Sequence, residues 1–159
     1  GSDNLKNEGA PIAQALAPDG IPAELLSAAL GPINARLAQS AADAQWPEVV
    51  IGADMAITYG GRQYSLISES EQWRSDAMVA EAIASQSSWR LLLLDRFDCL
   101  DLQGRSDLIA WLDVLADAGE VDSVFLFGTL KAEPTGLPAS IGTHWIDSGM
   151  AAQPLKEAA

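Results

Sequence analysis

The sequence predicts an α/β fold, in which a mainly parallel sheet is flanked by helices and accompanied by a small antiparallel hairpin. The first indication is the run of leucines at residues 91–94, which ends in Asp95 and is typical of a strand buried on both faces of a parallel sheet. A helical pattern and a second apolar run at residues 121–127 follow, and this succession implies a right-handed crossover between parallel strands. The third indication is Gly60-Gly61 between two short strand-like segments, which is typical of a hairpin.

The composition is typical of a single globular domain. The chain has 159 residues, of which 48% are hydrophobic, and this length is enough to bury a core. No apolar run approaches the length of a membrane span, and there is no signal-peptide pattern. The single cysteine, Cys99, excludes an internal disulfide and fits the cytoplasm, where we expect the protein. Because His144 is the only histidine, a Cys/His metal site is implausible.

The net charge of −13 limits the partners of the chain. Lys and Arg provide affinity for a phosphate backbone, and an acidic surface opposes it. We therefore expect contact with DNA only indirectly, through another part of an assembly that supplies positive charge.

The chain divides into three parts. Gly1-Ser2 is typical of a cloning remnant, and residues 1–20 as a whole are interpreted as a tag and flexible lead-in. Residues 21–148 are predicted to form the folded lobe, and residues 149–159 a tail.

The first elements of the lobe are a helix and a hairpin. Apolar residues recur at helical spacing from residue 21 onward, and Gly31-Pro32 interrupts the stripe, which predicts two helices or a kink. Residues 46–51 and 56–59 are predicted strands, and residues 62–66 return beside them.

Two more helices surround the leucine strand. Ser68 and Glu71 form a capping-box pattern that predicts a helix start, and the helix continues through Ala84. After Asp95, Ser106 is the predicted cap of a helix that ends at Gly119. Beyond the strand at residues 121–127, we expect a loop at residues 131–140 and a short strand at residues 143–146.

Three motifs carry a resemblance to a known family. Residues 68–72 read Ser-Glu-Ser-Glu-Gln at a helix start, Asp95 ends the apolar strand, and Leu100-Asp101 follows. In order and spacing they resemble the signature motif, the Walker B aspartate and the D-loop in the C-terminal half of an ABC-type ATPase head of the SMC, Rad50, RecF and RecN branch. The likeness covers roughly residues 21–148. Without it, Asp95 caps a turn, and Ser68 with Glu71 is a plain capping box.

The resemblance implies roles for these residues. Asp95 would bind Mg²⁺ beside ATP, since the carboxyl ends of parallel strands are where ligands bind in such sheets. Ser68, Ser70 and Gln72 would meet ATP held by a partner head at a helix N-terminus. Asp101 would lie at the head dimer interface. Thr129 is expected near Asp95, where the family often has a histidine that senses the γ-phosphate.

The chain also departs from the family pattern. It contains no Walker A loop, so we expect an N-terminal half with that loop, and a second head, as partners. Arg96 stands where the family has its catalytic glutamate, which leaves Asp98 as a substitute carboxylate or a turn residue. Glu69 and Ser70 replace the two signature glycines, and a carboxylate at position 69 would repel a phosphate unless it points away.

The expected function is therefore that of a C-terminal ATPase-head lobe in DNA repair, recombination, or a phage or defence process. ATP and Mg²⁺ would be bound only in the complete head, and the isolated chain would be inactive. The alternative is an inactive interaction lobe that keeps the fold for assembly. An unrelated Rossmann-like enzyme is disfavoured because the chain has no Gly-rich phosphate loop.

Overall fold

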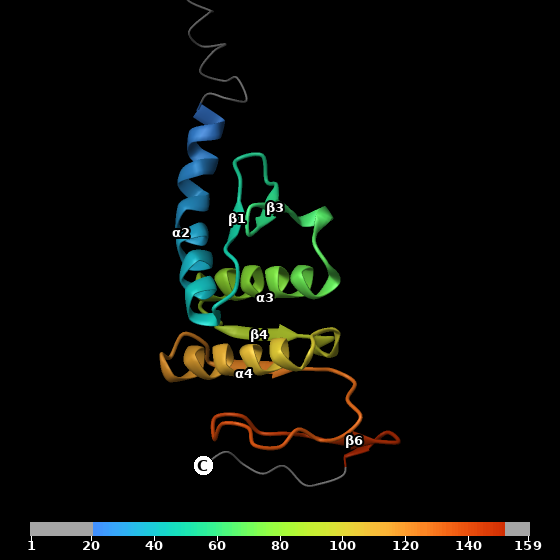
Figure 1. Ribbon diagram of the computed structural model, residues 1–159. Coiled ribbons are helices and arrows are strands. Elements are labelled where there is room, and N and C mark those ends of the chain that lie inside the picture. Colours follow the sequence, from blue (N-terminus) through green and yellow to red (C-terminus); the bar gives the residue numbers. More distant parts are fainter. Residues whose placement is uncertain (1–20, 152–159) are drawn as a thin grey trace, which may run out of the picture.

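The computed structural model describes residues 21–151, and our predictions for residues 1–20 and 152–159 lie outside this range. The chain forms helices, strands and two short 3₁₀ helices (Figure 1). In order they are α2 (Ile21–Ala44), β1 (Val49–Ile51), β2 (Ile57–Tyr59), β3 (Arg62–Gln63), η1 (Tyr64–Leu66), α3 (Glu69–Ser85), β4 (Leu91–Leu94), η2 (Phe97–Cys99), α4 (Leu102–Asp117), β5 (Ser123–Leu126), β6 (Ile146–Asp147) and β7 (Met150–Ala151).

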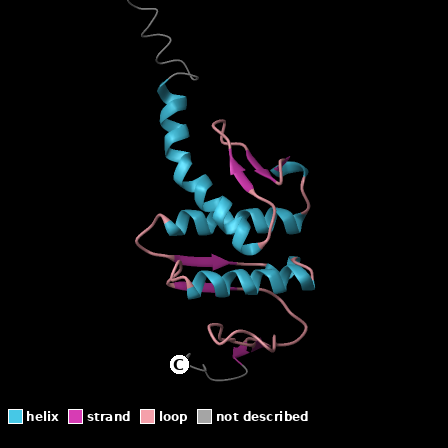
Figure 2. Ribbon diagram, turned by 60° about the vertical axis from the view of Figure 1, so that its left-hand side comes forward, coloured by secondary structure: helices cyan, strands magenta, loops and turns pink. Residues whose placement is uncertain are grey.

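The α2 segment is a single helix with Pro32 inside it, so the alternative of two separate helices was wrong. Figure 2 shows its axis bending along its length, as expected where a proline removes a backbone hydrogen bond. Leu30 and Leu37 are buried, and the helix packs against β1, α3 and α4. The apolar stripe of α2 therefore connects the antiparallel strand β1 with the helices α3 and α4.

The predicted hairpin is confirmed and has a third strand. β1 and β2 pair antiparallel with Val49 opposite Tyr59, and β2 pairs antiparallel with β3 through Thr58 and Gln63. The chain turns between β2 and β3 at Gly60 and Gly61, which both have positive φ angles. The following residues form η1 instead of extending the strand, and this 3₁₀ turn leads to the start of α3.

The strand, helix and strand succession from β4 through α4 to β5 is also confirmed. The two strands pair in parallel, with Leu91 opposite Ser123 and Leu94 opposite Leu126. The prediction that Ser106 caps α4 was wrong, because the helix begins at Leu102 and Asp101 is its N-cap. Gly119, at a positive φ of 65°, follows the helix end as expected.

The core lies on one side of the β4–β5 sheet. Leu92 and Leu94 point into it, and Trp111 of α4 packs against Trp46 with ring centroids 5.4 Å apart. Met78 and Ala82 contribute the facing side of α3. Helices α2, α3 and α4 and the strand β1 thus share one apolar cluster.

Within residues 21–151, nothing covers the opposite side of this sheet, so our prediction that β4 is buried on both faces was wrong. The side chains of β4 alternate between exposed and buried, and Leu93 is 62% exposed. Phe125 and Phe127 are each 52% exposed, and their rings stack 6.5 Å apart. We call the surface of Leu91, Leu93, Phe125 and Phe127 the open sheet face.

The described chain has mixed α/β architecture, but the expectation of a mainly parallel sheet was wrong. Only β4 and β5 run parallel, whereas β1, β2 and β3 form one antiparallel sheet, and β6 and β7 form another. Of the strand expected at residues 143–146, only Ile146 lies in a strand, β6. This strand pairs with β7, which lies in residues that we expected to belong to the tail. Residues 131–140 form the expected loop. Within residues 21–151, no helix is both long and apolar enough to cross a membrane.

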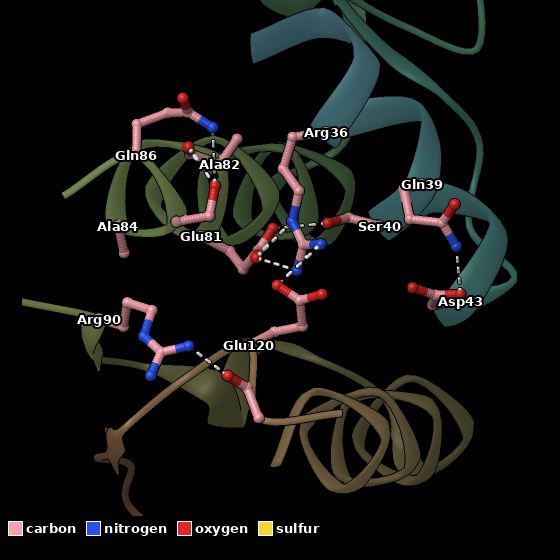
Figure 3. A network of polar contacts seen from close by, with 12 residues as sticks. Arg36, Gln39, Ser40, Asp43, Glu81, Ala82, Ala84, Gln86, Arg90 and Glu120 are labelled. Carbon is pink, nitrogen blue, oxygen red and sulfur yellow. Dashed lines mark hydrogen bonds and ion pairs between the residues drawn. The ribbon is translucent and has the colours of Figure 1, made fainter. Parts of the chain in front are cut away.

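A buried ion pair fixes α2 on α3 (Figure 3). The Glu81 side chain is 0% exposed, and its Oε1 accepts hydrogen bonds from Nε and Nη2 of Arg36 at 2.8 and 2.5 Å. The hydroxyl of Ser40 donates to Oε2 of Glu81 at 2.6 Å. Burial lowers the pKa of Arg36, but the carboxylates of Glu81, Glu120 and Asp43 together raise the pKa by more, so the guanidinium stays charged. Both carboxylate oxygens therefore have partners, as a buried charge requires.

Candidate functional site

The N-terminus of α3 has the predicted capping box. The hydroxyl of Ser68 accepts from the backbone N–H of Glu71 at 3.4 Å, and the Glu71 carboxylate accepts from the Ser68 N–H at 2.9 Å. Arg62 also pairs with Glu71, and this contact, followed by the bonds from Ser68, lowers the pKa of Glu71 to about 2. The Ser70 hydroxyl lies 3.3 Å from that of Ser68. The helix start is thus preorganised, and the N–H groups of its first residues have no intrahelical acceptor.

The carboxyl end of β4 lies beside this helix start. The indole N–H of Trp73 on α3 donates to the backbone oxygen of Asp95 at 2.7 Å. The Asp95 carboxylate accepts from the N–H of Arg96 at 2.8 Å. Arg96 has a left-handed backbone with φ 59°, and its guanidinium binds the Glu69 carboxylate at 2.6 Å. The end of β4 is therefore joined to the start of α3 by two contacts, Trp73 with the backbone of Asp95 and Arg96 with Glu69.

The loops after the two parallel strands are joined by Asp98. Its carboxylate accepts from the backbone N–H of Thr129 at 3.1 Å. Gly128 lies against the ring of Phe97, since a Cβ at this position would be 2.6 Å from that ring. The glycine therefore lets the loop after β5 come close to the loop that contains Asp98. Thr129 thus follows β5 at the carboxyl edge of the sheet, and the contact of its backbone is with Asp98 and not with Asp95, near which we expected it. Asp98 stabilises this loop pairing in the described structure, which is the turn-type role that the sequence left open.

Asp101 serves as the N-cap of α4 and is also near α3. Its carboxylate accepts from the N–H of Gly104 at 2.7 Å and lies 3.9 Å from Nη2 of Arg74. The Arg74 guanidinium stacks over the ring of Trp46 at 5.6 Å. A Cβ at Gly104 would be 2.5 Å from Arg74 Nη2, so a larger residue there would displace the end of the Arg74 side chain.

Two of the remaining polar side chains are engaged within the lobe. The amide of Gln72 donates to the backbone oxygen of Tyr64 at 3.1 Å, so it is turned toward η1. Arg105 donates to the backbone oxygens of Leu100 and Asp98 at 2.8 and 2.7 Å. Arg105 therefore shapes the loop between η2 and α4.

Asp95 is the residue at this end that we expect to bind Mg²⁺. Asp95 is exposed at the end of β4, and protein-bound Mg²⁺ commonly takes one or two carboxylates and completes its shell with phosphates and water. In the described part of the chain, no group of three or more His, Cys, Asp or Glu side chains is placed to hold a metal without such a ligand. Asp95 fits a metal that arrives with phosphate, and does not form a metal site by itself.

The Glu69–Arg96 contact was not anticipated from the sequence. In the sequence the two residues are separate departures from the family pattern. The sequence contains one signal for this contact: positions 69 and 96 carry opposite charges, whereas the family pattern has no such pair there. The contact turns the Glu69 carboxylate toward the Arg96 guanidinium, which offsets part of its negative charge.

The geometry thus brings the three motifs to one end of the lobe: the start of α3 with Ser68 and Ser70, the end of β4 with Asp95, and the start of α4 with Asp101. No protein-family model matches this chain, and no curated protein matches it.

Proposed function

We propose that this chain is the C-terminal lobe of an SMC-, Rad50- or RecF-like ABC ATPase head. It contributes the signature, Walker B and D-loop residues to ATP binding and hydrolysis at a head dimer, in DNA repair, recombination, or a phage or defence process. The observation that supports this most is the convergence of the three motifs at one end of the lobe. The bond from Trp73 to Asp95 and the proximity of Arg74 to Asp101 join the starts of α3 and α4 to the end of β4.

The open sheet face supports the idea that the lobe is completed by another part of the protein. Parallel sheets are covered on both faces in nearly all known proteins, and two strands alone are marginal. Alternation along β4 puts the exposed Asp95 on the same side as Leu91 and Leu93. A segment that covers this face and carries a Walker A loop would therefore bring nucleotide phosphates next to Asp95.

Different residues of the lobe would contact two different nucleotides, one bound in the same head and one bound in the second head. Asp95 would hold the Mg²⁺ of ATP bound in the same head, and the metal supplies charge neutralisation on the phosphates. Ser68, Ser70 and the free N–H groups of α3 would bind the terminal phosphate of ATP held by the second head. Asp101 would lie at the dimer interface. Gln72 would reach nucleotide only by leaving its bond to Tyr64.

One observation favours the alternative of a catalytically inactive interaction lobe. Arg96, which occupies the position of the catalytic glutamate, is bound to Glu69 and provides no carboxylate to polarise water. Steady-state ATP hydrolysis by the complete protein separates the two functions. Turnover that is lost in Asp95→Asn supports the ATPase, and ATP-driven association without turnover supports the inactive lobe.

Calorimetry on the chain alone and on the complete head tests the proposal itself. We expect ATP to bind the complete head, and not the isolated chain, because the phosphate loop lies elsewhere. Leu93→Asp should prevent assembly of the two halves by placing a charge on the open sheet face. Ile83→Asp, at an exposed apolar residue of α3, is the matched control. Tight ATP binding by the isolated chain would refute the proposal.

A further inference from the structure

The strand β5 has a free edge. Within residues 21–151 it pairs with β4 on one side and with no strand on the other. The N–H of Phe127 binds the carbonyl of Leu94 at the β4 edge. Because alternate residues of a parallel strand bond to the same neighbour, the N–H and C=O groups of Val124 and Leu126 face away from β4. This backbone has the geometry to pair with a further strand.

Two other strand edges of the lobe are protected, and this one is not. At the far edge of β4, the indole of Trp73 donates to the carbonyl of Asp95 at 2.7 Å. The outer strand of the antiparallel sheet, β3, consists only of Arg62 and Gln63, which are both exposed. Short or charged edges of this kind prevent pairing with other chains. The sequence of β5, Ser-Val-Phe-Leu, contains neither a charged residue nor a proline.

An apolar groove lies beside the free edge, between β5, α4 and the loop at residues 140–142, and has a volume of about 210 Å³. The hydroxyl of Ser140 donates to Asp113 on α4 at 2.5 Å, which holds the loop against the helix. A cavity of about 150 Å³ holds benzene, so this groove has room for one or two aliphatic side chains. Its apolar lining consists of Ile109, Leu112, Ala116, Val124, Leu126 and Ile141.

The free edge and the groove together fit an added strand. Such a strand would place every second side chain on the α4 side of the sheet, next to Val124 and Leu126. The side chains between them would extend the open sheet face. In strand addition of this kind, backbone hydrogen bonds provide affinity and pockets for alternate side chains provide specificity.

The charge of the chain distinguishes between possible occupants. The net charge is −13, and Asp122 is the charged residue among those that line the groove. Two copies of so acidic a chain repel each other, whereas a segment that carries lysine or arginine is attracted. The charge therefore favours a basic partner over a second copy of this chain.

We propose that β5 accepts, at its free edge, an extended segment of a partner polypeptide that has apolar side chains at alternate positions and a net positive charge. The segment pairs with the backbone of Val124 and Leu126 and inserts apolar side chains beside Ile109 and Ala116. This inference goes beyond the proposed function, because it requires neither a nucleotide nor a second head.

The test begins with selection on the full chain from a phage-displayed library of random decapeptides. Enriched peptides should alternate apolar and polar residues and contain more Lys and Arg than Asp and Glu. Their synthetic forms are then titrated by fluorescence anisotropy. Methylation of one alternate set of peptide nitrogens should weaken binding by about tenfold or more, because it removes the hydrogen bonds to the edge, and methylation of the other set by less than about twofold.

Two variants test the groove and the edge separately. Ala116→Phe should weaken peptide binding by about tenfold or more, because the ring fills the groove. Val124→Pro should act similarly, since it removes an edge N–H that β4 does not use. Ala110→Phe is the matched control, because Ala110 is also exposed on α4 but does not line the groove, and it should change binding by less than about twofold. Circular dichroism verifies that each variant is folded.

Several results would overturn the inference. These are a selection without enrichment, enriched peptides that do not alternate, and binding by folded Ala116→Phe that equals wild type. Equal losses in Ala110→Phe and Ala116→Phe would place the binding site elsewhere on α4. Self-association of the wild-type chain that Ala116→Phe abolishes, measured by analytical ultracentrifugation, would make a second copy the occupant and would equally refute a basic partner segment.

Discussion

Arg36 and Glu81 form an ion pair in the interior, whereas Arg96 and Glu69 form one in solvent. Both pairs tie α3 to another element, and their closest N···O distances are 2.5 and 2.6 Å. The Glu81 side chain is fully buried and accepts a third hydrogen bond, from Ser40, but Glu69 is two-thirds exposed. The same type of ion pair therefore has different effects when it is buried and when it is exposed to solvent. The interior pair holds α2 on α3, and the solvent pair contributes little to stability.

The largest expected effect follows from breaking the interior pair. Glu81→Ala should lower the free energy of unfolding of the isolated chain by about 3–5 kcal/mol, because it leaves the largely buried Arg36 guanidinium with only the more distant, partly exposed carboxylate of Glu120 at 3.4 Å. Urea denaturation followed by circular dichroism measures this loss. Glu81→Gln keeps the side-chain volume and part of the hydrogen bonding, and should cost less. A loss below about 1 kcal/mol for Glu81→Ala would mean that the pair does not hold the helices together.

Replacing both interior partners should recover most of that loss. The double variant Arg36→Met, Glu81→Leu fills the same space with apolar groups and removes both buried charges together. We expect its free energy of unfolding to lie within about 1 kcal/mol of the wild-type value. The same urea titrations give the coupling energy. Equal losses in the single and double variants would show that the helices need the charges themselves.

The capping box at the start of α3 provides a test of intermediate size. The folded-state pKa of Glu71 is about 2, against an ordinary value of 4.5, because of Arg62 and Ser68. Since the folded pKa is lowered, the stabilisation is complete above about pH 4.5 and is lost as the pH falls toward 2. Glu71→Gln retains the capping hydrogen bond but not the charge. The difference in thermal midpoint between Glu71→Gln and wild type should therefore disappear across this pH range, and a constant difference would contradict the assignment.

The smallest effect on stability is expected for the solvent pair. Glu69→Gln and Arg96→Gln should each change the free energy of unfolding by less than about 0.5 kcal/mol, because both side chains are largely exposed. Thermal and urea unfolding of the isolated chain measure this directly. A loss comparable with that of Glu81→Ala would make the solvent pair a structural element and remove the contrast with the interior pair.

The open sheet face shows where reasoning from the sequence was incomplete. The leucine run at β4 correctly predicts a strand, but four consecutive leucines look the same whether one face or both are covered. Coverage depends on what packs against Leu91 and Leu93, and α2, α3 and α4 all lie on the side of Leu92. The start of α4 was similarly misjudged, because both Asp101 and Ser106 are good capping residues and the η2 turn decides between them.

The sequence by itself determined the local events: the capping box of Ser68 and Glu71, the strand at residues 91–94, and the parallel crossover to β5. These depend on neighbouring residues and on periodicity, both of which are visible in the chain. Only the tertiary structure decided that Glu69 meets Arg96, that Asp98 binds the backbone of Thr129, and that one face of the sheet is left bare. The physical reason is that such contacts join residues far apart in sequence, whose distance is set by how the helices pack on the sheet.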